Sequence, residues 1–550
     1  MIEIKVLKFH SEGADAMRSR QAILVVGLLL VTLVGLTTSS HAIPAFSRQY
    51  GTSCTTCHLD FPKLNDFGKA FKDAGFKFPK DDESFLKVPP VMLGAPAQKD
   101  LWPHTVFPGT IPGLPPIGLR FNQFFQYTGN SANNFNQQNA LGTPGSTIGP
   151  NVPRTDFAPG FFSIFMAGNF GSDIAFWVDD DLSVSGANAN GGLGDGYLKF
   201  VNLGRVFKLP TDSLSLRVGQ FELDLPFTGA RSINLSPYDI YTEANVGAMN
   251  GLTGFPALFQ NVNNTFGMGG AAHGVELSGG HTYAGYHYSL AIVDQNTSGN
   301  SASPPNVPSP TGGSSGGVGF FSDSNYKDIY ARFAYRFNLE KDPASRHEVQ
   351  AAGATGPGDH TYLSLGTFYF KGRSVQRFSG FLPDGTTPAA LVAREPFYRW
   401  GGDFSFNYRT FNLFGLYMYG HDDDLLLNST FTGFTGGPAA KFNGGFLQAD
   451  YLVLPWVMAI MRYDRVQSTA DFLNQIGSQA GAPNPGNFFS PVGATRNRVT
   501  PGVQFLIHAN IKASFEYQIR PQQVVYNADG TRATSPFRTN TATTALEFVY

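Results

Sequence analysis

The chain has 550 residues, of which 15% are charged and 14% aromatic, and its formal net charge is −2. These values exclude a helical membrane protein, which needs several apolar runs of about 20 residues. They also exclude a disordered chain, because aromatic residues are abundant, and they give no electrostatic case for binding nucleic acid. High Gly and aromatic contents with little charge favour a large all-β structure instead.

The N-terminus, residues 1–42, has the pattern of a secretory signal peptide. Two Arg residues precede an apolar run at 22–36, and a small-residue cleavage motif ends at Ala42. The alternative is a membrane-anchoring helix, but the apolar run is short for one. Acidic residues ahead of the basic pair indicate that translation begins at Met17.

The two cysteines belong to one motif, Cys54-Thr55-Thr56-Cys57-His58. C-x-x-C-H is the attachment pattern of c-type haem: the thiols form thioethers with the two vinyl groups, and the adjacent His coordinates the iron. Haem is attached outside the cytoplasm, so the export signal is independent support. A disulfide or redox C-x-x-C is the alternative, but it leaves the His unexplained, and no βαβ context is visible. The sequence therefore predicts one covalently bound haem c, held by Cys54, Cys57 and His58.

Residues 43–88 are predicted to form a minimal monohaem cytochrome c domain. Asp60 is placed to cap a helix that ends at Gly75. The apolar residues on one face of this helix, which share helical spacing, are expected to pack against the haem; they are Leu64, Phe67 and Phe71. So short a domain has too small a core to be stable without the cofactor or a surrounding wall.

The Pro-rich segment 89–116 is predicted to be a stiff, extended tether. It contains the two candidates for a sixth iron ligand, Met92 and His104, of which Met92 ranks first. A Met ligand raises the haem potential, whereas a second His gives a lower one. Water, a barrel residue or an open position remain alternatives, as does a simple packing role for both side chains.

Residues 117–550 are predicted to form an antiparallel β-barrel. About sixteen segments of roughly ten residues alternate between apolar and polar side chains. In 511–520, for example, apolar residues alternate with Lys512 and Glu516. A soluble β-sandwich gives the same alternation. The alternating tight turns and long loops, such as 372–395, and the terminal aromatic Tyr550 favour an outer-membrane barrel with both termini in the periplasm.

A barrel of this size leaves a lumen wide enough for a channel or a plug. In a passive porin, Arg side chains facing the lumen would tune anion passage; they are Arg217, Arg332, Arg336 and Arg399. Two acidic clusters near outer strand ends carry hard carboxylate ligands that suit Fe(II); they are His421 to Asp424 and Asp179 to Asp181. A solvated acidic loop is the commoner explanation of such clusters.

The residues around the haem motif form an extended pattern. They are Ile43-Pro44-Ala45-Phe46-Ser47-Arg48-Gln49-Tyr50-Gly51 before it, and Pro62-Lys63-Leu64, Phe67-Gly68-Lys69 and Phe71-Lys72-Asp73-Ala74-Gly75-Phe76 after it. This pattern resembles the N-terminal signature of the fused monohaem cytochrome c–porins, a family that includes the outer-membrane iron oxidases of iron-oxidising bacteria. The chain departs mildly from the signature at Ser47, Tyr50, Lys69 and Phe76. The barrel matches the family only in architecture.

The resemblance implies a haem-plugged barrel that moves electrons across the outer membrane. It also implies oxidation of extracellular Fe(II) and transfer of electrons to a periplasmic carrier such as a soluble cytochrome. The alternative function is a passive porin with a structural haem plug. A peroxidase-like enzyme needs a distal acid or base, and the sequence shows no such constellation.

Overall fold

The computed structural model describes residues 45–550, with gaps at 79–81, 104–109, 115, 129–153, 172, 184–192, 229–231, 243–267, 269–270, 295–325, 340–360, 382–387, 423–439, 469–494, 520–523, 527–531 and 535–539. The predicted signal peptide, the start at Met17 and the ligand candidate His104 lie outside the described residues. Among the described residues, no helix is both long and apolar enough to cross a membrane.

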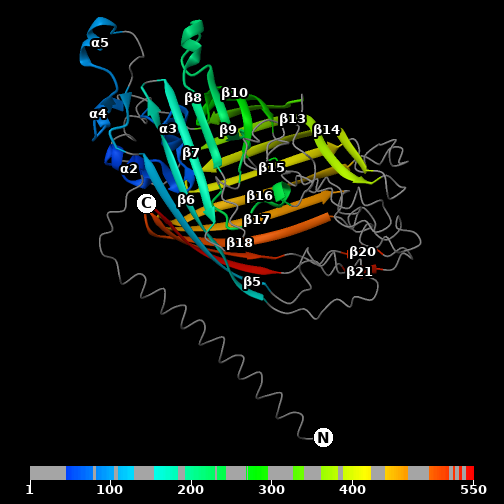
Figure 1. Cartoon of the computed structure of the whole chain (residues 1–550). Helices are drawn as coiled ribbons and strands as arrows, with labels where there is room; N and C mark the ends of the chain where they lie inside the picture. The colour runs from blue at the N-terminus through cyan, green and yellow to red at the C-terminus, as the bar shows by residue number, and fades with distance from the viewer. Residues whose placement is uncertain are drawn as a thin grey trace, which may run out of the picture. The chain divides into compact units, whose positions relative to one another are not determined.

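Within the described part of the chain, sixteen antiparallel strands close into a barrel (Figure 1). The first of them, β5 (Ile117–Thr128), pairs with the last, β22 (Thr541–Val549), and every other pairing joins strands that follow one another along the barrel. The strands between are β6 (Arg154–Phe170), β7 (Ile174–Ser183), β8 (Leu193–Phe200), β9 (Ser215–Glu222), β10 (Ala271–His281), β11 (Ala284–Asp294), β12 (Asp328–Asn338), β13 (Tyr362–Phe381), β14 (Pro388–Tyr408), β15 (Phe411–Asp422), β16 (Ala440–Leu454), β17 (Val457–Ser468), β18 (Thr495–His508) and β19 (Ile511–Gln518).

The burial of the strand residues distinguishes a membrane barrel from a soluble sandwich. On β19, Phe515 and Tyr517 are 41% and 37% exposed, whereas Lys512 and Glu516 are 4% and 2% exposed. A soluble sandwich would bury the aromatic face and expose the charged one. Here the apolar residues face outward and the polar residues fill the interior, as in barrels that cross an outer membrane. The predicted fold class is confirmed.

The predicted loop at 372–395 is wrong for most of its length. β13 continues to Phe381 and β14 begins at Pro388, so the two strands extend well beyond the apolar alternation that defined them in sequence. The predicted alternation with tight turns is confirmed at the next connection, where Arg409 has a φ of +54° between β14 and β15. Such short turns lie at the end of the barrel that also holds the C-terminus (Figure 1).

The N-terminal elements lie at this same end of the barrel, next to the C-terminus (Figure 1). They begin with α2 (Ala45–Tyr50) and the 3-10 helix η1 (Cys54–Thr56), followed by a hairpin of β1 (His58–Asp60) and β2 (Lys63–Leu64) and by α3 (Asp66–Asp73). The helix predicted to be capped by Asp60 therefore starts later. Asn65 is its cap, because the preceding residues pair as strands.

The predicted end of this helix is confirmed. Gly75 has a φ of +79°, and its N–H donates to the carbonyl of Lys72 at 3.1 Å. The N–H of Phe76 donates to the carbonyl of Phe71 at 2.9 Å. These two bonds satisfy the last helical carbonyls through a left-handed residue, which Gly adopts without strain.

The segment 89–116 is not extended throughout. It contains the short helix α5 (Pro96–Leu101) and two short strands, β3 (Val91–Met92) and β4 (Thr110–Ile111), which pair with each other. The short helix α4 (Asp82–Phe85) precedes this segment. The prolines therefore separate small folded elements.

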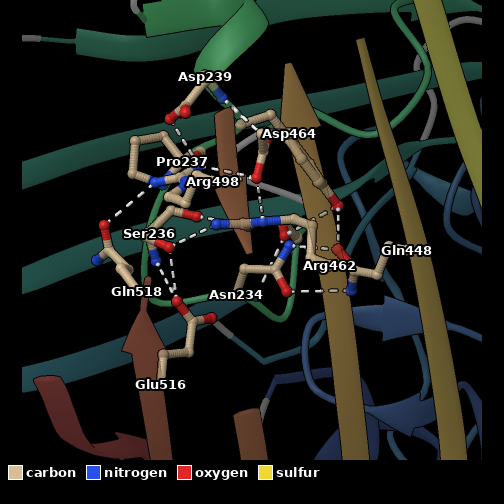
Figure 2. Close-up of polar contacts among 12 residues, drawn as sticks. Asn234, Ser236, Pro237, Asp239, Gln448, Arg462, Asp464, Arg498, Glu516 and Gln518 are labelled. Carbon is tan, nitrogen blue, oxygen red and sulfur yellow. Dashed lines mark hydrogen bonds and ion pairs between the residues drawn. The ribbon is translucent and has the colours of Figure 1, made fainter. Parts of the chain in front are cut away.

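A segment that follows β9 reaches the opposite wall of the barrel; we call its described residues, 223–228 and 232–242, the crossing segment. It ends in the one-turn helix α7 (Asp239–Thr242). Its Ser236 hydroxyl donates to Glu516 on β19 at 2.6 Å, and the Asp239 N–H donates to Asp464 on β17 at 3.1 Å (Figure 2). The carbonyl of Ser236 also accepts from Arg462 at 2.9 Å. The crossing segment is thus fixed to the wall by buried, charge-assisted bonds.

Removal of Phe548 to Tyr550 is expected to impair barrel formation. Phe548 pairs with Ile511 of β19, and Tyr550 exchanges two backbone hydrogen bonds with Leu119, so the deletion cuts the last pairings of the closing strand. The yield of compact, heat-modifiable protein in dodecyl sulfate gels is the measurement. Tyr550→Phe keeps the terminal aromatic and should assemble normally. Equal yields of the truncation and the native chain would contradict the prediction.

Candidate functional site

The two cysteines of the haem motif lie on one short turn. Cys54 begins η1, and the N–H of Cys57 donates to the carbonyl of Cys54 at 3.2 Å, which closes this turn. Both are partly buried and neither is in a disulfide among the described residues. Burial raises the pKa of Cys57 to about 12, so this thiol is protonated at neutral pH.

Asn65 connects the haem motif to α3. Its side-chain amide donates to the carbonyls of Thr55 and Thr56, at 3.2 and 3.0 Å, and its Oδ1 accepts from the N–H of Gly68 at 2.8 Å. A Cβ on Gly68 would lie 2.1 Å from the carbonyl oxygen of Cys57. The Asn cap and the missing side chain at Gly68 therefore hold the helix directly against the motif.

A cavity of 850 Å³ lies between the N-terminal elements, the crossing segment and the barrel wall. Its volume falls within the range of about 300–1,000 Å³ that is usual for cofactor sites. Cys54, Cys57 and His58 all line it. Of the three residues predicted to pack against haem, Leu64 and Phe71 also line the cavity. Phe67 does not, because it is fully buried against Phe78, with ring centroids 5.0 Å apart.

His58 meets the requirements of a haem ligand. Its Nδ1 is buried and has no hydrogen-bond partner within the described part of the chain. Burial lowers the pKa of His58 to about 4, although backbone hydrogen bonds to Pro62 and Lys63 act in the opposite direction. The ring is therefore neutral at pH 7, the form that binds a metal. Two thiols and an imidazole on one cavity fit haem c, and Cys54, Cys57 and His58 would hold it.

The sixth-ligand assignment to Met92 stays a prediction. Met92 lies on β3, is 39% exposed and is not among the residues that line the cavity. Within the described residues, His287 on β11 is the second histidine that lines the cavity, and its Nε2 lies 2.8 Å from Oδ2 of Asp224. The one signal for His287 in the sequence is its place among the alternate residues of its strand that point into the barrel. The sequence left a barrel residue open as ligand, and His287 occupies such a position.

A buried ion pair fixes α3 to the barrel wall. Arg336 on β12 donates to both carboxylate oxygens of Asp66, at 2.7 and 2.6 Å, and Lys69 reaches Asp66 at 3.1 Å. Burial acts to raise the pKa of Asp66, but Lys69 and Arg336 outweigh it and hold that pKa well below its usual range. A second bond joins Lys63 to Asp450 on β16 at 2.8 Å. The haem motif is thus held in the barrel mouth.

The four predicted lumen-facing arginines all have partners. Arg217 pairs with Glu276 at 2.6 Å and Arg332 with Asp403 at 2.7 Å, in addition to the pair of Arg336 with Asp66. Arg399 donates to backbone carbonyls of its own and the neighbouring strand. Three of these positive charges are therefore neutralised by carboxylates, and the fourth guanidinium binds backbone carbonyls of the barrel wall. This weakens the case that the four arginines tune anion passage.

The described residues of the two acidic clusters make separate contacts. Asp179 lines the cavity and accepts from the N–H of Asp195, whereas His421 stacks on Tyr398 with ring centroids 5.1 Å apart. Asp423 and Asp424 lie outside the described residues. Among the residues that the structure describes, no group of three or more His, Cys, Asp or Glu is placed to hold a metal ion. An Fe(II)-access role for these clusters stays a prediction.

Comparison with known proteins gives likeness in fold only. No family profile matches the chain and no curated protein is similar to it. Similar solved structures include the outer-membrane channel DcaP of Acinetobacter baumannii, with 12% identity and a TM-score of 0.39 over 79% of this chain and 96% of that chain. The anion-selective porin from Comamonas acidovorans has 11% identity and a TM-score of 0.40 over 79% and 98% of the two chains. OprB of Pseudomonas putida has 9% identity and a TM-score of 0.40 over 79% and 94%. With TM-scores this low, these likenesses carry no argument about function.

Replacement of both thiols, Cys54→Ala with Cys57→Ala, is expected to abolish covalent haem. The measurement is haem staining after denaturing electrophoresis, which retains only haem bound through thioethers. Met92→Leu is the matched control, since it leaves the attachment chemistry intact and should keep a full band. A band that persists in the double Ala variant would refute haem attachment at this motif.

Asp66→Asn is expected to destabilise the N-terminal domain by about 3–5 kcal/mol, because it leaves Arg336 buried without its countercharge. Chemical denaturation followed at the haem absorption band measures this loss. Adding Arg336→Met removes the unpaired charge and should restore most of the stability. If Asp66→Asn alone is as stable as the native protein, the pair does not hold the domain in place.

Proposed function

We propose that this protein is an outer-membrane barrel that carries one haem c in its lumen and conducts electrons between the cell exterior and the periplasm. The observation that carries the proposal is the position of Cys54, Cys57 and His58 on a cavity inside the barrel. The outward aromatic band supports a membrane location, and the short turns beside both ends of the described chain support a periplasmic position for this end.

A bound haem c supplies reversible one-electron transfer. The chain's own residues hold and enclose it. Asn65 and Asp66 fix the attachment segment at the mouth of the barrel. Beside the cavity, Phe227 of the crossing segment packs on Phe414, with ring centroids 4.6 Å apart. Tyr238 of the same segment stacks on Phe446, with ring centroids 3.8 Å apart. These apolar contacts shield the cavity from the outer side. A haem inside the lumen also shortens the path across an apolar band about 25 Å tall.

The electron donor in this proposal is extracellular Fe(II), and the acceptor is a soluble periplasmic cytochrome. Support for both partners comes from the resemblance of the N-terminal pattern to the cytochrome–porins. The protein would then act as an Fe(II)-oxidising outer-membrane cytochrome, with the haem as its redox centre and His58 as the iron ligand.

A passive porin with a structural haem plug is the second candidate, and the closed sixteen-strand barrel is the observation that favours it. Two features count against free passage. The N-terminal domain is bound at one mouth, and the crossing segment is fixed across the lumen. The paired lumen arginines also present little free positive charge to a passing anion.

Stopped-flow mixing of the intact, oxidised protein with Fe(II) is expected to give rapid haem reduction. The same preparation in planar bilayers should be nearly closed to ions. Zinc(II), which has no accessible one-electron couple, is the matched control and should leave the haem spectrum unchanged. An open channel with no reduction by Fe(II) would reject the conduit and leave the porin. Reduction by Fe(II) through an open channel would mean that iron diffuses to the haem.

A further inference from the structure

The N-terminal domain touches both strands that close the barrel. Arg48 on α2 donates from Nη2 to the carbonyl of Ile117, the first residue of β5, at 2.7 Å. Its guanidinium also lies 5.3 Å from the ring centre of Tyr550, which directly follows β22. One side chain of the domain therefore bridges the first and last strands of the barrel.

A second contact reaches β5 and β19, the two strands on either side of β22. Lys512 on β19 donates to the carbonyl of Phe61, and the guanidinium of Arg120 on β5 lies 5.7 Å from the centre of the Phe61 ring. Both of these cations also pair with Glu547 on β22, Arg120 at 3.2 Å and Lys512 at 3.9 Å. Phe61 thus contacts two members of an ion cluster that joins three adjacent strands, β5, β22 and β19.

The second contact is linked to the haem-attachment segment. The rings of Phe61 and His58 have centroids 5.4 Å apart. Any disorder of the His58 region would therefore disturb the contact of Phe61 with Arg120 and Lys512. A small domain with little core of its own is expected to become better ordered when it binds a cofactor.

We call the pairing between β22 and β5 the seam of the barrel. It is the pairing that gains most from contacts outside the two strands. Every other pair in the barrel joins strands that follow one another in the chain, whereas β5 and β22 come from the two ends of the barrel sequence. Bringing distant segments together costs more loop-closure entropy than forming a hairpin. A domain that precedes β5 and also contacts Tyr550 lowers that cost.

We propose that the N-terminal domain has a further function as a clasp that holds the seam of the barrel closed, and that this clasp acts only when the domain is loaded with haem. Haem attachment and barrel closure are then coupled, so a chain that has not received its cofactor makes a weaker barrel. The haem dependence rests on the proposed haem attachment; the contacts of Arg48 and Phe61 with the seam do not.

The test compares Arg48→Gln with Arg409→Gln in the full-length, haem-loaded protein. Arg409 is exposed at the β14–β15 turn, away from the seam, and its guanidinium lies 5.4 Å from the ring centre of Tyr408, so its loss removes a similar cation–π contact. The midpoint temperature of the heat-modifiable gel shift is the measurement. We expect Arg48→Gln to lower it by about 1–3 °C and Arg409→Gln to leave it unchanged. Equal midpoints for the two variants would overturn the clasp.

The same pair of variants is then made in the Cys54→Ala, Cys57→Ala background. There the clasp is already undone, so the background itself should have a lower midpoint and Arg48→Gln should lower it no further. An equal effect of Arg48→Gln in both backgrounds would overturn the coupling to haem. Haem staining and Fe(II) reduction of the native chain are scored separately, so failure of the electron-transfer function is distinguishable from failure of the clasp.

Discussion

The ion pair between Asp66 and Arg336 sets the position of the haem motif in the barrel. Asp66 is the first residue of α3, and its neighbour Asn65 holds the carbonyls of Thr55 and Thr56. Arg336 faces inward from β12, so the pair ties the start of α3 to one point of the wall. Removing one partner of a buried ion pair is strongly destabilising, because the other charge is left buried and uncompensated. Together with the pair of Lys63 and Asp450, this contact holds the motif beside the cavity.

The barrel makes such pairs necessary because its polar face points inward. Arg462 and Arg498 are almost fully buried, and they pair with Asp464 and with the backbone of the crossing segment (Figure 2). An empty lumen would leave these groups to water. Instead the crossing segment supplies partners for these two arginines, and Asp66 of the N-terminal elements supplies the partner of Arg336. The closure of the lumen and the enclosure of the cavity are therefore two results of the same requirement, that buried charges be paired.

The segment that carries Cys54, Cys57 and His58 contacts both the cavity and the closing strands of the barrel. Its His58 lines the cavity, and the adjacent Phe61 contacts residues of the closing strands. A domain too small to fold well alone gains order from the wall, and the wall gains contacts across its seam. In the proposed function, a cofactor held by this segment would serve both the redox path and the closure of the sheet.

The sequence by itself determined the features that depend on short spacing. Period-2 alternation located all sixteen barrel strands, and the five-residue motif at 54–58 defined the Cys54, Cys57 and His58 set, because both patterns lie in neighbouring residues. It misplaced the start of α3, because the residues expected to begin the helix pair as the β1–β2 hairpin. Only the tertiary structure joined Asp66 to Arg336, 270 residues apart, and brought His287 to the cavity. Such contacts depend on how the barrel closes, which no local pattern encodes.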